Sequence, residues 1–141
     1  HKAKKIKNAT IERYYFNIIK AVFSNGNIKT SDELLGKNFG LILNDFKNNL
    51  KISEANLSLL KKHNFKIINF TENRSESNFD NYISCQETHD DMKTYCERYD
   101  CNGVIVRPDK YVYDLINYGE NDNLEMVISK VLKSLKEKID L

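Results

Sequence analysis

The chain has 141 residues, of which 40% are apolar and 30% charged, so it can bury the core of one domain. No apolar run approaches the ~18 residues that a membrane-spanning helix needs, and the mean hydropathy is −0.59. The formal net charge is only +2, but seven basic residues and one acidic residue fall within residues 1–30. Such a basic arm is typical of a solvated tail or a connection to a neighbouring domain, so we expect neither nucleic acid nor membrane as a partner. The start of the chain, at His1, lacks the apolar segment of a secretory signal, and three cysteines make no disulfide framework, so we expect a cytoplasmic protein.

Residues 10–23 place apolar side chains at helical spacing, which predicts an amphipathic helix after the basic arm. Asn25 and Gly26 then predict a turn. We therefore divide the chain into a basic arm with a helix, residues 1–24, and a folded domain, residues 25–141.

The middle of the chain predicts a strand, a helix and a second strand. Residues 39–43 form a continuous apolar run that is typical of a buried strand, and residues 65–70 predict the next strand. Between them, residues 53–63 predict a helix that Ser53 caps and that Asn64 ends in a left-handed conformation. This order predicts a right-handed unit with two parallel strands. Residues 71–87 are polar and predict an irregular surface loop.

The C-terminal half predicts a helix, a hairpin and a final helix. The first helix, residues 88–99, begins at Thr88, with Asp91 as its partner in a capping box. Two strands, 103–107 and 111–115, flank a three-residue turn led by proline. The last helix begins at Asp122 and runs to residue 139.

From residue 39 the order is β-α-β-α-β-β-α. It predicts an α/β, thioredoxin-like fold with a mixed four-stranded sheet and an extra N-terminal helix.

Both elements of a thioredoxin-type redox site are missing from the sequence. The first is a cysteine between the strand 39–43 and the helix that follows, where the helix dipole favours a thiolate, but residues 44–53 contain none. The second is a cis-proline just before the strand 103–107, but that stretch reads Asp-Cys-Asn-Gly. The one proline, Pro108, follows the strand. We therefore expect no disulfide exchange and no catalytic residue in this chain.

The other candidate sites have ordinary structural interpretations. Cys85, His89, Cys96 and Cys101 could hold zinc, but their spacing matches no standard zinc motif, and buried structural cysteines are the commoner outcome. The acidic residues of 71–101 could assist proton transfer or bind a cation, although a solvated surface is the simpler interpretation. No phosphate-binding glycine motif is present. We therefore expect no metal and no cofactor in this chain.

Two segments together carry a resemblance to a known family. The first is residues 24–43, with Asn25-Gly26, Gly36, Phe39 and an apolar strand, and the second is the hairpin of residues 101–115, with Arg107-Pro108-Asp109, Tyr111 and Val112. They resemble the C-terminal thioredoxin-like domain of FAD-dependent aromatic-ring hydroxylases, of the phenol hydroxylase and hydroxyphenylpropionate hydroxylase type. The resemblance covers roughly residues 25–138, and its signature residues are Gly36, Phe39, Arg107, Pro108, Asp109 and Tyr111. Lys110 departs from the family pattern, in which glycine stands in the turn.

The resemblance implies an accessory domain that lacks a cysteine pair and braces the catalytic domains of the same polypeptide or a second copy of itself. FAD and NAD(P)H would then bind elsewhere in a parent oxidoreductase. Tyr111 and Tyr113 alternate along one strand and could pack internally or form a contact between subunits. The interface residues we expect are Tyr14, Tyr15, Ile18, Tyr111 and Tyr113. Two alternatives remain open at this point: a free-standing interaction module without redox activity, and a thiol or metal protein that uses the three cysteines.

Overall fold

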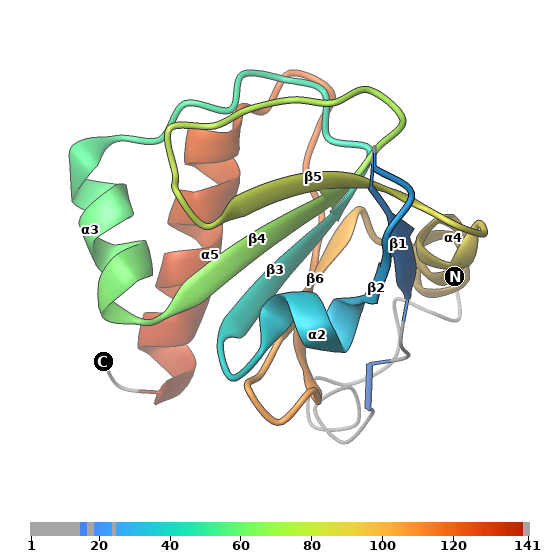
Figure 1. Cartoon of the computed structure of the whole chain (residues 1–141). Coiled ribbons are helices and arrows are strands. Elements are labelled where there is room, and N and C mark those ends of the chain that lie inside the picture. Colours follow the sequence, from blue (N-terminus) through green and yellow to red (C-terminus); the bar gives the residue numbers. More distant parts are fainter. Residues whose placement is uncertain (1–14, 17–18, 24, 140–141) are drawn as a thin grey trace.

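The computed structural model describes residues 15–16, 19–23 and 25–139. It forms one mixed sheet of seven strands with helices on both faces (Figure 1). The strands are β1 (Lys20–Val22), β2 (Ile28–Thr30), β3 (Phe39–Asn44), β4 (Phe65–Phe70), β5 (Tyr82–Glu87), β6 (Gly103–Val106) and β7 (Val112–Ile116). The helices are α2 (Ser31–Leu35), α3 (Glu54–Lys62), α4 (Asp91–Tyr99) and α5 (Leu124–Ile139).

The strands lie in the order β2-β1-β5-β4-β3-β6-β7. The three central strands β5, β4 and β3 are parallel, with Leu41 beside Ile67 and Ile67 beside Tyr82. The flanking strands β1 and β6 run antiparallel to them, and β7 pairs with β6 as a hairpin. The carboxyl ends of β3, β4 and β5 therefore meet at one edge of the sheet, together with the start of β6.

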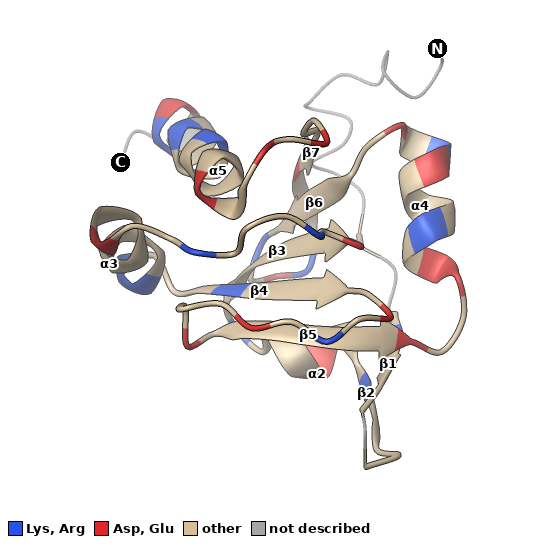
Figure 2. Ribbon diagram, turned by 90° about the horizontal axis from the view of Figure 1, so that it is seen from above, with Lys and Arg blue, Asp and Glu red and all other residues tan. Residues whose placement is uncertain are grey.

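Two hydrophobic cores cover the two faces of the sheet. Helices α3 and α5 lie against one face and α4 against the other (Figure 2). Alternation along β3 divides its side chains between the cores, because Leu41 and Leu43 face α3 and α5, while Ile42 faces α4. Both faces of the central strands are thus buried, which explains the continuous apolar run of residues 39–43. Among the described helices, none is long and apolar enough to cross a membrane.

The local signals in the middle of the chain are confirmed. Ser53 caps α3 by accepting a hydrogen bond from the N–H of Asn56, and Asn64 takes a φ of 54° after the helix. The turn between β6 and β7 is also confirmed, and Lys110 adopts a φ of 74° there. Lys110 thus adopts a left-handed backbone conformation that glycine would adopt with less strain than lysine.

The prediction of four strands and an N-terminal helix is wrong in the described residues. Residues 20–22 form the strand β1, and Tyr15 makes an isolated antiparallel bridge with Tyr111; residues 10–14 and 17–18 of the expected helix lie outside the described residues. Backbone pairing of β1 with β2 and β5 overrides the helical spacing, which short apolar segments satisfy by coincidence.

The expected loop of residues 71–87 contains β5, and residues 31–35 form the unpredicted helix α2. Polar residues Ser84, Gln86 and Glu87 conceal β5 in the sequence, because its parallel pairing with β4 uses the backbone rather than an apolar pattern. Thr30 and Glu33 form the capping box that starts α2.

Candidate functional site

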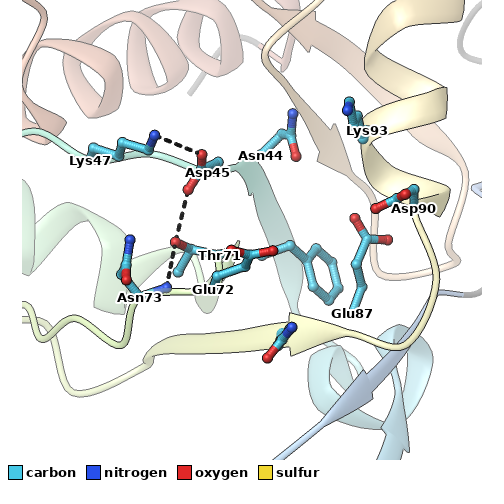
Figure 3. Close-up of a pocket in the computed structure, with 11 residues that line it drawn as sticks. Asn44, Asp45, Lys47, Thr71, Glu72, Asn73, Glu87, Asp90 and Lys93 are labelled. Atoms are coloured by element: carbon cyan, nitrogen blue, oxygen red, sulfur yellow. Dashed lines mark hydrogen bonds and ion pairs between the residues drawn. The ribbon is translucent and has the colours of Figure 1, made fainter.

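A polar cavity of about 390 Å³ lies at the carboxyl ends of β3, β4 and β5 (Figure 3). This is the edge at which open sheets with parallel strands usually bind ligands. The cavity is lined by Asn44, Asp45, Lys47, Phe70, Thr71, Glu72, Asn73, Gln86, Glu87, Asp90 and Lys93.

Asp45 leaves the end of β3 with a φ of 53°, and its carboxylate is held on both sides (Figure 3). Thr71 Oγ1 donates to its Oδ1 at 2.9 Å, and Lys47 Nζ lies 3.1 Å from its Oδ2. Its backbone N–H donates to the carbonyl of Phe70 at 2.7 Å. The side chain of Lys47 is 67% exposed, so this ion pair orients Asp45 more than it stabilises the fold.

Asn69 holds the loop that follows β3. Its side chain is fully buried in β4, and its Oδ1 accepts the backbone N–H of Phe46 at 3.0 Å. Its Nδ2 donates to the carbonyl of Phe46 at 2.9 Å and to Tyr82 Oη at 3.0 Å. Asn69 therefore fixes the backbone next to Asp45. The sequence does not mark this role, because an asparagine within the strand 65–70 carries no signal that its partner lies in a distant loop.

Glu87, not Thr88, caps α4. The N–H of Met92 donates to its Oε1 at 2.8 Å, whereas Thr88 Oγ1 is bonded to His89 Nδ1. Asp90, at the N-cap position, makes no capping bond with its side chain. Burial raises the pKa of the Glu87 carboxyl above its usual value, although the N–H of Met92 opposes the change. The capping box of Thr88 and Asp91 is thus a wrong prediction, because α4 begins only at Asp91 and Glu87, four residues before it, accepts the N–H of Met92.

A second hollow, of about 470 Å³, adjoins the cavity between the loop after β3 and the start of β6. Asn102 lies just before β6, where thioredoxin-type redox proteins carry a cis-proline. Its carbonyl accepts the N–H of Asn44 at 3.1 Å, its N–H donates to Ile116, and its Oδ1 accepts the N–H of Tyr118. All three groups are used within the sheet and its loops, so none of them is offered to a substrate.

The signature residues of the hairpin gather at the opposite end of β3 from the cavity. Arg107 lies 2.5 Å from the carboxylate of Asp109 and stacks over the ring of Tyr111 at 5.9 Å. Lys110 Nζ donates to the carbonyl of Gly36, which has a φ of 58°, and to that of Pro108 at 3.1 Å. The structure thus joins two segments about seventy residues apart in the chain into one cluster.

Comparison with known protein families shows which family the chain belongs to. A family model described as the HcaD C-terminal domain matches residues 20–132. The chain belongs to the HcaD C-terminal domain family. This assignment agrees with the resemblance to a C-terminal domain of hydroxylase-type proteins. The family match begins at β1 and ends within α5, so it takes in both the hairpin cluster and the polar cavity.

Solved structures similar to this HcaD C-terminal domain confirm its thioredoxin-like fold. A yeast mitochondrial 1-Cys peroxiredoxin aligns over 89% of this chain and 76% of its own, with a TM-score of 0.55 and 12% identity. A thiol:disulfide interchange protein from Bacteroides sp. aligns over 90% and 89%, with a TM-score of 0.55 and 14% identity. BsSco, a member of the Sco family of cytochrome c oxidase assembly proteins, aligns over 87% and 92% with the same score and identity. No curated protein matches the chain in sequence.

The expected interface residues of this family member fall into three groups. Tyr14 and Ile18 lie outside the described residues. Tyr15 and Tyr111 are exposed, at 50% and 38%, and their rings meet edge to face at 5.5 Å. Tyr113 is buried, and its ring packs edge to face on Phe39, so it belongs to the core of the domain.

The three cysteines are all buried and free. Within the described part of the chain, no three His, Cys, Asp or Glu side chains come close enough together to hold a metal ion. Cys85 lies on β5, and His89 bonds to Thr88, whereas Cys96 lies within α4 and Cys101 follows the end of that helix. The four residues that the sequence offered for zinc are therefore not one cluster.

Proposed function

We propose that this chain is a non-catalytic, redox-inactive accessory domain of a FAD-dependent aromatic monooxygenase. FAD and NAD(P)H would bind to other domains of the parent enzyme, which would carry all of its catalytic groups. The domain would pack against those catalytic domains or against a second copy of itself. Membership of the HcaD C-terminal domain family and the thioredoxin-like fold support the proposal.

The observation that carries the redox-inactive part of the proposal is the carboxylate of Asp45 at the end of β3. Thioredoxin-like redox proteins place a cysteine between this strand and the next helix, where the helix N-terminus stabilises a thiolate. Here the Asp45 carboxylate pairs with Thr71 and Lys47 in this place, and residues 44–53 contain no cysteine. A hydrogen-bonded carboxylate cannot form a mixed disulfide, so the geometry of this edge favours a structural or binding role.

A thiol–disulfide exchange assay tests the redox part of the proposal. The reduced chain would be mixed with insulin and dithiothreitol, and the precipitation of insulin would be followed over time. We expect insulin to precipitate no faster with the chain than with dithiothreitol alone, both for the wild type and for Cys101→Ser. A clear acceleration that Cys101→Ser removes would contradict a redox-inactive domain.

The packing surface that we propose is the exposed pair Tyr15 and Tyr111 beside Arg107. Exposed aromatic rings next to an arginine are enriched at protein interfaces. The pair also lies on the hairpin cluster, at the opposite end of β3 from the polar cavity. Packing there would leave the cavity uncovered.

Replacement of Tyr111 by serine in the full-length parent protein tests this surface. We expect a lower melting temperature for flavin release, or dissociation of the dimer, because the contact loses its aromatic centre. Met126→Ser is the matched control, since Met126 is 45% exposed but lies on α5. Equal effects of the two substitutions would contradict an interface at the hairpin.

A free-standing interaction module is the second candidate, and an apolar groove between α3 and α5 favours it. The groove, of about 350 Å³, is lined by Leu59 and Leu132 and bordered by Lys62, Lys133 and Lys136, which together suit an acidic amphipathic segment. A native gene product of this size, without flavin, would select this candidate.

A further inference from the structure

Helices α3 and α5 lie side by side on one face of the sheet, and a hydrogen bond joins them in the first half of each helix (Figure 1). In this bond Asn56 Nδ2 donates to Ser129 Oγ at 3.2 Å. One turn further along each helix, the groove of about 350 Å³ opens, with Leu59 and Leu132 as its apolar lining. Leu59 is 39% exposed, because the adjacent Leu60 is the residue that faces the core. The groove therefore presents aliphatic surface that the fold leaves uncovered.

All the charged side chains that line this groove are lysines. Lys62 lies on the α3 side, and Lys133 and Lys136 lie on the α5 side. In the part of the chain that the structure describes, none of these three lysines forms an ion pair. An acid of the same helix pair lies toward the other end, where Glu125 accepts the N–H of Ser53 at 2.9 Å. Lysines in the last turn of a helix complement its dipole, but the dipole does not account for exposed leucine between two rows of lysine.

The two sides of the groove determine the kind of occupant that fits. Cations on both sides match a ligand that carries carboxylates on either flank of an apolar stripe. The backbone groups of α3 and α5 bond within each helix, so the groove offers only side chains, and the occupant must satisfy its own backbone hydrogen bonds. A helix does so, whereas an extended peptide does not.

The exposed lysines also favour a reversible contact. Lysine is depleted at the centre of protein interfaces, and permanent interfaces are more apolar than this groove. Charges at the rim of an interface act chiefly on the rate of association and make binding depend on salt. These properties suit a separate protein that binds and leaves.

We propose that the groove between α3 and α5 is the docking site for an acidic amphipathic helix of a separate partner protein. Apolar side chains at every third or fourth position of that helix would contact Leu59 and Leu132, and carboxylates on its two flanks would pair with the lysines. The inference rests on the binding role proposed for this groove and not on the flavin parent. The hairpin surface of Tyr15 and Tyr111 shares no residue with the groove, so a failure at one surface leaves the other unaffected.

Backbone amide spectra of the isotope-labelled full chain, recorded during titration with a synthetic helix, test the proposal. The probe is a peptide of ~18 residues, long enough to form a helix, with leucine at every third or fourth position and glutamate on both flanks. Its twin carries lysine in place of every glutamate. We expect saturable shifts of residues 59–63 and 132–136 with the acidic peptide, and at least ~10-fold weaker binding of the twin. Raising the salt from ~0.05 M to ~0.5 M should weaken the acidic peptide several-fold.

A charge-reversed variant and its matched control locate the binding. Lys133→Glu combined with Lys136→Glu should weaken the acidic peptide by at least ~10-fold, because one side of the groove becomes repulsive. Lys29→Glu combined with Lys51→Glu changes the net charge equally, and both lysines are exposed outside the groove. This control should retain the affinity to within ~3-fold, since distant charges are screened by salt.

A second pair of variants tests the apolar lining. Leu59→Gln should weaken the acidic peptide, whereas Met126→Gln should not, because Met126 is 45% exposed on α5 but does not line the groove. Four outcomes would overturn the proposal: no saturable binding of the acidic peptide, equal affinity for its twin, unchanged affinity in the Lys133 and Lys136 variant, or shifts centred on Tyr111. Shifts of the groove residues when the chain alone is concentrated would also overturn it, because a second copy would then be the occupant.

Discussion

Replacement of Asn69 by alanine should lower the free energy of unfolding by about 2–4 kcal/mol. The side chain is fully buried and makes three hydrogen bonds of 2.9–3.0 Å, two of them to the backbone of Phe46. Each bond contributes about 0.5–1.5 kcal/mol, and the orphaned N–H and carbonyl of Phe46 add a desolvation cost. Asn69 lies 23 residues from Phe46 in the chain, so the bonds that the substitution removes are tertiary contacts.

Urea unfolding of the intact chain, followed by circular dichroism, measures the effect through the shift in midpoint at constant m-value. Asn49→Ala is the matched control, because Asn49 is exposed and its side chain accepts one local bond, from the N–H of Lys51 at 2.9 Å. It should cost about 0.5 kcal/mol or less. If Asn69→Ala cost no more than this control, Asn69 would not hold the loop beside Asp45, and that part of the site's description would be refuted.

Three further predictions concern the close packing at Gly103, the backbone of the hairpin turn at Lys110 and the ionisation of Glu87. Gly103→Ala should lower the free energy of unfolding, measured in urea, by about 1–3 kcal/mol, because the added Cβ would lie 2.6 Å from the carbonyl oxygen of Ile42. Gly119→Ala is the control and should have little effect, since the nearest atom to its added Cβ is 3.9 Å away. Equal losses of stability in the two variants would refute the close packing at Gly103. Lys110→Gly should be about 1 kcal/mol more stable than Lys110→Ala, since both variants lose the ammonium group and only glycine adopts a φ of 74° without strain. Equal urea midpoints for the two variants would contradict the left-handed backbone at this position. Burial raises the pKa of folded Glu87, so its ionisation lowers stability as pH rises from the unfolded pKa through the folded one. Glu87→Gln should therefore gain stability relative to wild type at neutral pH and lose this gain below pH ~4.5, and a gain that does not change with pH would argue against a buried carboxylate.

The sequence predicts best the elements that local chemistry determines. Ser53 and Asn64 mark the ends of α3 through their own side chains and backbone, and Pro108 sets the turn between β6 and β7. The central strands β3 and β4 are apolar because both of their faces are buried. These features follow from residues close together in the chain.

The sequence predicts worst what depends on distant backbone. The strands β1 and β5 are recognisable only through their pairing with other strands, so helical spacing and polarity misled the prediction at both places. The candidate site shows the same limit. Asp45 meets its partner Thr71 across the sheet edge, and Glu87 displaces Thr88 as the cap of α4 because of how the loop after β5 turns.

The central claim is that this chain is an accessory domain of a larger flavin enzyme. The most direct measurement is the intact mass and the visible spectrum of the native gene product, purified from its source. The account predicts a polypeptide several times longer than this domain, yellow with bound flavin. A colourless protein of about this size would contradict it and leave only the shared fold.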